Sequence, residues 1–352
     1  MRFWKIYLLV FISISCQDKE SLTSLDDSNI WPTREWQYKN YAAANISGKF
    51  LESIRDSVTE KHSLLVIKDG YIVHESHQAP YGKDSLIHVN SCTKSVISIL
   101  FGMVFKNQWQ LQENRSAISY FPEYQTDDTL INKIKVKHLL SMSSGLTWRG
   151  GIDATDVLGM SETDDWARYV FQRNFEHEPG EIYHYNSGGT QVISSILHKA
   201  SKISLSDFAR DSLFSKLGIF DYKWDTTPKG ILKAGWGLHL KMHDMAKLGY
   251  LLLKQGKWQE QQLIARDWIG RATENKITVS EQYGYGYQFW ISRNIGVKNF
   301  FFRGSYPPSK KIITVIPEFN TVVVYVGENY DTNRLLRDFI VPAIKRKADN
   351  KK

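Results

Sequence analysis

Residues 89–100 read VNSCTKSVISIL, and this stretch decides both the fold and the chemistry expected of the chain. It holds a Ser-x-x-Lys tetrapeptide, Ser91 to Lys94, which occurs once in the 352 residues. A β-rich run at 86–89 precedes the tetrapeptide, and apolar residues follow it at helical spacing. The pattern predicts a strand followed by a helix that starts at Ser91. The apolar residues on one face of this helix are Val96, Ile97, Leu100, Phe101 and Val104.

Ser91 and Lys94 lie one helical turn apart, so their side chains share one face of the predicted helix. A serine hydroxyl is a weak nucleophile unless a base accepts its proton, and a buried, uncharged lysine can be that base. The helix start adds backbone N–H donors for an oxyanion. Helix capping is the structural alternative for Ser91, but capping does not require a lysine three residues later. We therefore interpret the pair as a nucleophile and its base.

Strand signals lie near both ends of the chain. Residues 63–76 read SLLVIKDGYIVHES, two β-rich runs around an Asp-Gly turn, and residues 312–327 form a second pair of runs. Residues 106–230 have mainly helix and loop signals. We predict an α/β fold of the α+β type: an antiparallel sheet flanked by helices, with a mostly helical insertion at about 106–230.

Composition and charge fit a globular domain with a large core, since 42% of the residues are hydrophobic and 23% are charged. The formal net charge is +8, but the lysines are scattered and no nucleic-acid motif is present. We therefore expect no nucleic-acid partner. We predict one domain over 35–345 and a solvated basic tail over 346–352.

The first residues have the layout of a secretory signal. Arg2 and Lys5 precede an apolar run at 6–14 that is too short to cross a bilayer as a helix. Cys16 ends a Ser-Ile-Ser-Cys segment that resembles a lipoprotein signal. We predict a lipoprotein-like signal peptide over 1–16, lipid attachment at Cys16 and a polar tether over 17–34. The protein would then be exported, as a periplasmic or outer-membrane lipoprotein with no membrane contact besides the lipid.

Cysteine and histidine usage indicates neither a disulfide framework nor a metal site. Once Cys16 is lipidated or removed, Cys92 has no partner, so the fold must rest on its core. Cys92 follows the serine directly, points elsewhere on the helix and is expected to be a small buried apolar residue. His239 and His243 are four residues apart, a spacing that zinc can use, but no third ligand is evident. We expect no metal and no cofactor.

Five segments resemble, in order, those of the β-lactamase-related serine hydrolases. This family holds class C β-lactamases, penicillin-binding DD-peptidases, certain esterases and 6-aminohexanoate-dimer hydrolases, and Ser-x-x-Lys is one of its signatures. The resemblance covers about residues 45–330 and implies a β-lactamase/transpeptidase-like fold. The segments are HSLLVIKDGYIVHES (62–76), VNSCTKSVISIL (89–100), VKHLLSMSSGLTW (136–148), GEIYHYNSGGTQVISSIL (180–197) and AGWGLHLKMHDMAKLGYLLLKQGKW (234–258).

The resemblance implies a catalytic tyrosine followed two residues later by Asn or Ser, which matches Tyr185 and Ser187. A phenol near a lysine ammonium can pass protons between nucleophile and leaving group. Tyr183 is the alternative if the register slips by two residues. A half-buried loop ring is the structural alternative for Tyr185.

The family's third motif, usually Lys-Thr-Gly or His-x-Gly on a strand beside the nucleophile, matches Phe302-Arg303-Gly304-Ser305. Gly304 would let substrate approach the strand, and the Ser305 N–H would be the second oxyanion donor beside that of Ser91. Arg303 would either bind a substrate carboxylate or face solvent. Phe302 replaces the expected Lys or His, and residues 306–309 read as an insertion before the strand.

These features predict a serine hydrolase of a small ester, amide or peptide, acting through an acyl-Ser91 intermediate with Lys94 and Tyr185 as general base and acid. The chain has no Gly-x-Ser-x-Gly, which argues against an α/β-hydrolase fold. The alternative is a non-hydrolytic acyl-binding or sensor protein on the same scaffold, motivated by Phe302 and by the expected insertion that contains Pro307 and Pro308. Aromatic residues around Tyr283 and Trp290 either line the cleft or pack beneath it.

Overall fold

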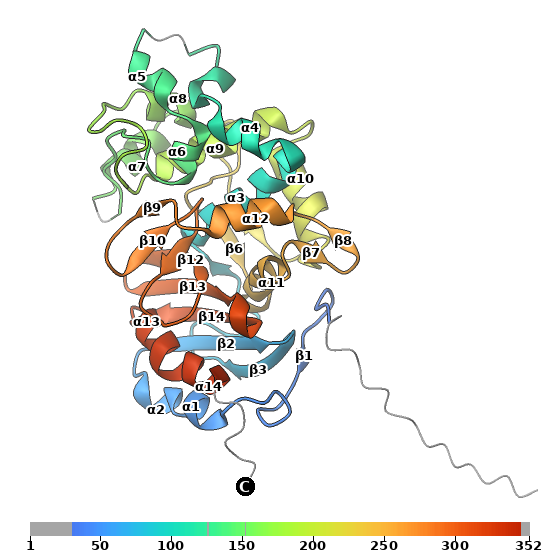
Figure 1. The fold of residues 1–352 in the computed structure, drawn as a ribbon. Helices are drawn as coiled ribbons and strands as arrows, with labels where there is room; N and C mark the ends of the chain where they lie inside the picture. The colour runs from blue at the N-terminus through green and yellow to red at the C-terminus, as the bar shows by residue number, and fades with distance from the viewer. Residues whose placement is uncertain (1–29, 125–126, 152, 346–352) are drawn as a thin grey trace, which may run out of the picture.

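The computed structural model describes residues 30–124, 127–151 and 153–345 (Figure 1). The predicted signal peptide, the lipidation site Cys16, the first part of the tether at 17–34 and the basic tail lie outside the described residues. Within the described ranges, no helix has the length and apolarity needed to cross a bilayer.

A nine-stranded sheet forms the lower part of the molecule in Figure 1, in the order β1-β3-β2-β14-β13-β12-β11-β10-β9. An early and a late segment of the chain meet within it, because β2 runs antiparallel to β14. The two hairpins expected from the sequence therefore share one sheet. The strands are β1 Gln37–Tyr38, β2 His62–Lys68, β3 Tyr71–Ser76, β9 Ile277–Thr278, β10 Tyr283–Tyr285, β11 Trp290–Ser292, β12 Phe300–Tyr306, β13 Ser309–Ile316 and β14 Thr321–Glu328.

Both faces of the sheet are covered, which explains why its central strands are almost continuously apolar. In β2, Leu65 and Ile67 join the core that contains the helix after Ser91, whereas Leu64 and Val66 pack with the terminal helices on the other face. Because successive side chains of a strand point to opposite faces, β2 contributes to both hydrophobic cores. The covering helices are α3 Cys92–Phe105, α11 Met242–Leu253 and α12 Arg266–Thr273 on the first face, and α1 Gly48–Glu52, α2 Ile54–Ser57, α13 Thr332–Leu335 and α14 Val341–Lys345 on the second.

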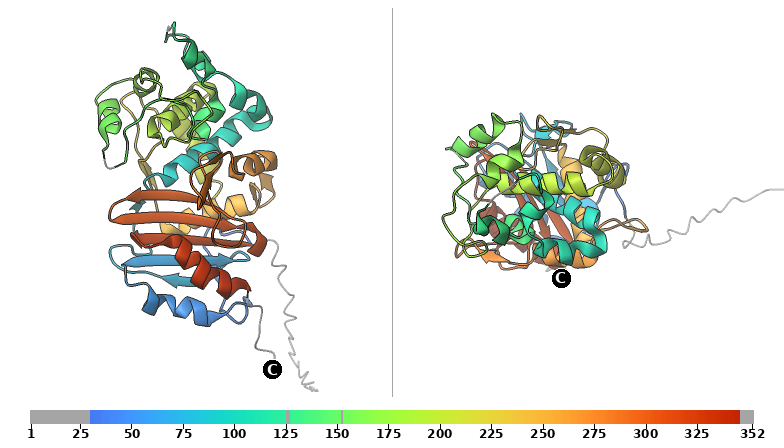
Figure 2. Two further views of the ribbon diagram at one scale, coloured as in Figure 1. Left: turned by 60° about the vertical axis from the view of Figure 1, so that its left-hand side comes forward. Right: turned by 90° about the horizontal axis from the view of Figure 1, so that it is seen from above.

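A mostly helical part stands on the β9–β12 end of the sheet (Figures 1 and 2). Its longest helix, α9 (Ser187–Ala200), packs against α3 and α8 and begins where the Asn186 side chain accepts a hydrogen bond from the Gly189 N–H at 2.9 Å. The predicted fold class is confirmed by this arrangement. The other helices here are α4 Trp109–Asn114, α5 Thr129–Lys133, α6 Val136–Leu140, α7 Thr155–Ser161, α8 Trp166–Phe171 and α10 Leu205–Ala209.

Two short sheets complete the described residues. One contains β4 (Ile87–His88), β6 (Leu238–Leu240) and β5 (Lys223–Trp224), in that order, and leads the chain into α3. The other pairs β7 (Lys257–Trp258) with β8 (Gln261–Gln262). The first of them matters for the site, because β4 ends three residues before Ser91.

The expected insertion at 306–309 is wrong. Tyr306 on β12 pairs with Ser309 on β13, so Pro307 and Pro308 form the turn of an uninterrupted antiparallel hairpin. Two prolines are not among the usual residues of a two-residue hairpin turn, which is why the pattern suggested an insertion.

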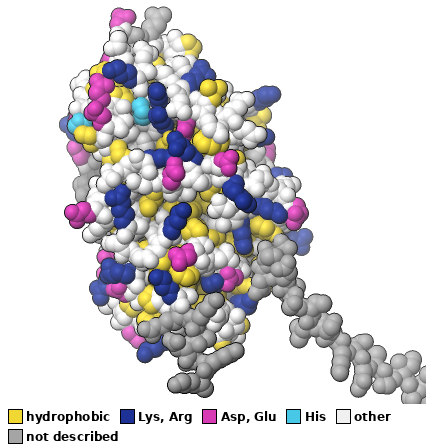
Figure 3. Space-filling view, viewed as in Figure 1, with side chains coloured by type: hydrophobic (Ala, Val, Ile, Leu, Met, Phe, Trp, Pro, Cys, Tyr) yellow, Lys and Arg dark blue, Asp and Glu magenta, His cyan; other side chains and the backbone are white. Residues whose placement is uncertain are grey.

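Charged side chains are spread over the surface. On the face drawn in Figure 3, lysines and arginines lie among aspartates and glutamates and do not gather into one patch.

Glu75 on β3 joins three separate elements through its carboxylate. Its Oε1 accepts hydrogen bonds from His77 Nε2 at 2.7 Å and His243 Nε2 at 2.8 Å, and its Oε2 accepts one from the Tyr38 hydroxyl at 2.5 Å. Burial alone would raise the pKa of Glu75, but these hydrogen bonds outweigh it and lower the pKa to about 2. The charged carboxylate therefore ties β1 and α11 to β3.

Glu75→Gln should lower the free energy of unfolding by about 1–2 kcal/mol at neutral pH, since the charge-assisted hydrogen bonds are lost. A pKa lowered on folding stabilises the fold above the ordinary carboxyl pKa, and this contribution disappears as pH falls from about 4.5 to about 2. Thermal unfolding of wild type and variant should accordingly converge over that range. The exposed Glu281→Gln variant is the control, and a stability gap that does not change with pH would contradict the role assigned to Glu75.

Candidate active site

Ser91 stands at the start of α3, where the small sheet delivers it. The Val89 N–H donates to Leu238 O at 2.9 Å, which fixes the segment just before the serine. Ser91 is the N-cap residue by position, but its side chain makes no capping hydrogen bond. The hydroxyl is instead the acceptor for Lys94, and Ser91 remains partly exposed. The structural alternative of a capping serine therefore does not describe this side chain.

Lys94 is buried, with 1% of its surface exposed. Its Nζ donates to Ser91 Oγ at 3.1 Å and to Gly235 O at 2.7 Å. Neither partner is a carboxylate, so the amine is held by neutral acceptors beside the serine. Burying a lysine with only neutral acceptors costs free energy, because no carboxylate offsets the loss of hydration.

Tyr185, and not Tyr183, is the ring that meets Lys94. The Lys94 Nζ lies 4.9 Å from the centroid of the Tyr185 ring. Tyr183 packs against Tyr285 at 5.4 Å, its hydroxyl is buried without a hydrogen-bond partner in the described part of the chain, and burial raises its pKa. The register expected for the second motif, not the one slipped by two residues, thus brings serine, lysine and tyrosine together.

Two further residues close the site around Lys94. Ser187, at the first turn of α9, is buried, and a Cβ placed on Gly235 would lie 3.1 Å from its Cβ and 3.6 Å from Lys94 Nζ. Sequence reasoning missed Gly235, because its contribution is a backbone carbonyl. The only sequence signal for Gly235 is its place in the AGWG stretch, which begins the family-like segment that continues into α11.

Gly304 on β12 lies directly against the segment that precedes the nucleophile. A Cβ on Gly304 would come within 2.1 Å of Val89 O, closer than any real Cβ contact. Beyond Phe301, β12 has β13 as a partner but is no longer paired with β11. The exposed Ser305 therefore lies on a strand segment whose second edge has no strand partner among the described residues, beside the start of α3.

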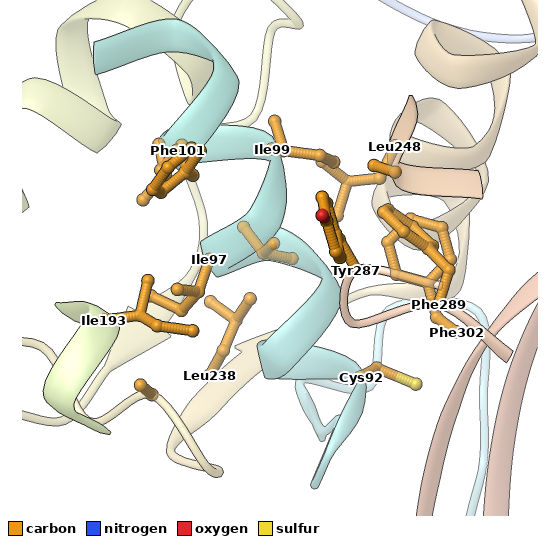
Figure 4. Packing of buried hydrophobic residues seen from close by; sticks show 14 of the residues in the cluster. Cys92, Ile97, Ile99, Phe101, Ile193, Leu238, Leu248, Tyr287, Phe289 and Phe302 are labelled. Carbon is orange, nitrogen blue, oxygen red and sulfur yellow. The ribbon is translucent and has the colours of Figure 1, made fainter. Parts of the chain in front are cut away.

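Phe302 is a core residue. It is fully buried and packs edge-on against Phe289 at 5.2 Å. Figure 4 shows this pair on the same side of α3 as Leu248, whereas Ile97 and Ile193 meet on the other side. The residue that replaces the family's Lys or His thus fills the interior next to the site.

Arg303 is connected to Tyr185 by contacts between its guanidinium and aromatic rings. Its guanidinium lies 5.0 Å from the centroid of Trp290 and 5.9 Å from that of Tyr283, and Trp290 also contacts Tyr185 at 6.3 Å. Arg303, Trp290 and Tyr283 are each partly exposed. The neighbouring Tyr285 is buried and packs beneath them.

The remaining chemically reactive residues serve the fold. Burial raises the pKa of the Cys92 thiol to about 12, and its Sγ contacts Lys311 O at 3.4 Å. The rings of His239 and His88 lie 4.6 Å apart and are tilted by 33°, while His243 donates a hydrogen bond to Glu75. The two histidines thus have different partners, and no group of three or more metal-ligating side chains occurs within the described ranges.

The beta-lactamase family model matches residues 54–335, a stretch that contains Ser91, Lys94, Tyr185 and Gly304. The chain belongs to the beta-lactamase family. Members of this family are serine hydrolases, so the protein is a hydrolase of the beta-lactamase fold. A search of curated proteins gave no match.

Solved structures with the same fold come from several branches of this family. A structure described as a 6-aminohexanoate-dimer hydrolase from Bacillus anthracis has a TM-score of 0.70 at 17% identity, covering 89% of this chain and 88% of its own. An octameric penicillin-binding protein homologue from Pyrococcus abyssi has a TM-score of 0.65 at 20% identity, with 85% and 78% covered. A class C beta-lactamase has a TM-score of 0.65 at 13% identity, with 89% and 97% covered. At these identities the likeness shows the fold.

Gly304→Ala tests how tightly β12 and the start of α3 must fit in this beta-lactamase fold. The added methyl must push the strand away from Val89, which should cost about 1–3 kcal/mol of stability and slow acylation of Ser91. Thermal unfolding and the rate of labelling by a fluorophosphonate measure the two effects. Gly270→Ala in α12 is the matched control, since a Cβ there meets nothing within 4 Å. Equal behaviour of the two variants would contradict the close fit at Gly304.

Proposed function

We propose that the chain is a serine hydrolase that cleaves a small ester or amide through a covalent acyl-Ser91 intermediate. The observation that supports this most directly is the 3.1 Å hydrogen bond from Lys94 Nζ to Ser91 Oγ at the start of α3. Because the hydroxyl makes no capping bond, it is available to a substrate carbonyl.

In the acylation step, Ser91 Oγ bonds to the carbonyl carbon as its proton passes to the uncharged amine of Lys94. The carbonyl electron pair moves onto oxygen, where the N–H groups of Ser91 and Ser305 stabilise the charge. As the oxyanion collapses, the bond to the leaving alcohol or amine breaks, Tyr185 delivers a proton to this group, and the proton that Lys94 took from Ser91 passes on to Tyr185.

Deacylation repeats the same steps with water as the nucleophile. Water loses a proton to the Lys94–Tyr185 pair and its oxygen bonds to the acyl carbon; the bond from that carbon to Ser91 Oγ then breaks, the acid leaves, and the proton returns to restore the Ser91 hydroxyl. Ser187 and the Arg303–Trp290 pair are the side chains proposed to contact the substrate. A guanidinium held over a ring keeps its donors available to a carboxylate.

Ser91→Ala should abolish labelling by a fluorophosphonate or a fluorescent penicillin and lower turnover of a nitrophenyl ester at least about 1000-fold. Ser98→Ala is the matched control, because Ser98 lies in the same helix, is fully buried and has a hydroxyl without a hydrogen-bond partner in the described part of the chain. It should leave labelling unchanged.

Labelled wild-type protein that never completes a second turnover would favour the acyl-binding alternative. Undiminished labelling of Ser91→Ala would remove Ser91 from the mechanism. Comparing esters, linear amides, D-peptides and β-lactams with the wild-type protein would then identify the substrate.

We also propose that the protein is exported and carries a lipid on Cys16. The support is the order of basic residues, apolar run and Ser-Ile-Ser-Cys at 13–16. In a bacterial host fed an alkyne fatty acid, the wild-type chain should take up the label and fractionate with membranes, and Cys16→Ser should do neither. Equal labelling of both chains would refute the assignment, and Cys92→Ser controls for loss of a thiol elsewhere.

A further inference from the structure

The carbonyl that accepts from Lys94 belongs to a backbone segment, residues 231–237, that crosses the site between β5 and β6. Gly235 lies at its middle, with Lys94 on one side and Ser187 close to its Cα. An uncharged lysine amine has two N–H bonds and one lone pair. When the Gly235 carbonyl accepts one N–H, it limits rotation about the Cε–Nζ bond, so the position of that carbonyl decides whether an N–H, as in this structure, or the lone pair faces Ser91 Oγ.

Gln191 on α9 holds this segment from the side of the helical part. Its Oε1 accepts from the Ala234 N–H at 2.9 Å and its Nε2 donates to Leu232 O at 3.2 Å. Gln191 is 1% exposed. A buried amide with both ends satisfied by backbone groups fixes the segment in two places, on the residue next to Gly235 and two residues earlier.

The opposite side of the segment is held by the strand that leads to the nucleophile. The Gly237 N–H donates to His88 Nε2 at 3.1 Å, and His88 is three residues before Ser91. Lys233 is tied outward, since its N–H donates to Asp225 O at 2.9 Å. The Gly235 carbonyl thus lies between an anchor on α9 and an anchor on β4, the two elements that also carry Ser187 and lead to Ser91.

We propose that Gln191 is a positioning residue for Lys94. It holds Ala234, the residue before Gly235, so that the Gly235 carbonyl fixes the Lys94 amine in the orientation that receives the Ser91 proton. The inference rests on the proposed function, because it assigns to Gln191 an effect on the proton transfer of the acylation step.

Ser194 supplies a control within the same helix. Its hydroxyl is fully buried and donates to Leu232 O at 2.8 Å, but it does not reach Ala234. Loss of Ser194 removes a buried hydrogen bond from the same segment without releasing the N–H of Ala234, the residue before Gly235. Gln191→Met and Ser194→Ala therefore separate positioning of the carbonyl from general support of the segment.

The experiment measures kcat and KM for a nitrophenyl ester across pH. Each kcat is divided by the number of active sites, which is titrated with a fluorophosphonate. Thermal unfolding of each variant is measured in parallel. Gln191→Met should lower kcat about 10- to 100-fold, change KM less than about 3-fold and shift the pH profile of kcat/KM, because a displaced base loses its geometry. Ser194→Ala should keep the wild-type kcat and pH profile at a comparable loss of stability. A residue with only a structural role would lower stability and the number of active sites, and would leave kcat per site and the pH profile unchanged.

If Gln191→Met does not fold, Gln191→Glu tests the same proposal. In Gln191→Glu, the protonated carboxyl can both accept from Ala234 and donate to Leu232, whereas the ionised carboxylate can only accept. The ratio of wild-type to variant kcat should therefore rise with pH. A constant ratio, or a wild-type kcat per site in Gln191→Met, would overturn the role of Gln191 and leave the hydrolase intact. Failure of the wild-type protein to form an acyl-enzyme would instead refute the proposed function.

Discussion

The hydrogen-bonded amine of Lys94 is the constraint on which the rest of the site depends. A lysine Nζ in the interior must have acceptors, because an unpaired amine there would cost several kcal/mol. One acceptor is the side chain one turn earlier on the same helix, and the other is a backbone carbonyl 141 positions away in the chain. This second acceptor exists only if the helical part and the sheet come together correctly. The reactive geometry is therefore a property of the whole domain and not of the tetrapeptide alone.

The packing around α3 follows from this requirement. The helix lies between the sheet and α9 and all its residues except Val104 are buried, while Lys94 in its first turn donates to the Gly235 carbonyl. Phe302 and Cys92 fill the side toward the sheet, and the absence of a side chain at Gly304 lets the strand touch the backbone before the serine. The site has little room for adjustment, because strand, helix start and crossing segment are each in van der Waals contact with the next.

What the sequence could predict was set by the range of each interaction. Ser91 and Lys94 are three residues apart, so helical geometry alone predicted that they would meet, and the two hairpins were visible as local strand-turn-strand patterns. Tyr185 came from a resemblance, since no local rule brings a tyrosine to a lysine some ninety residues earlier. Gly235 was missed because a carbonyl is present in every residue and leaves no trace in the sequence. The turn at Pro307 was read as an insertion because its residues are not those of a common hairpin. The packing of Trp290 between Tyr185 and Arg303 could not be predicted either, because contacts between rings on separate elements follow no repeating pattern in the sequence.

The pairing of β2 with β14 affects the order in which the parts of the sheet can fold. Lys68 pairs with Thr321 and His62 with Gly327, so β2 cannot pair with β14 until residues 321–327 have left the ribosome, more than 250 residues after β2. Until then the first hairpin exposes two apolar faces and an unsatisfied edge, which invites association with other chains. A chain of this topology exposes that edge for longer during synthesis than one whose sheet is built from neighbouring segments.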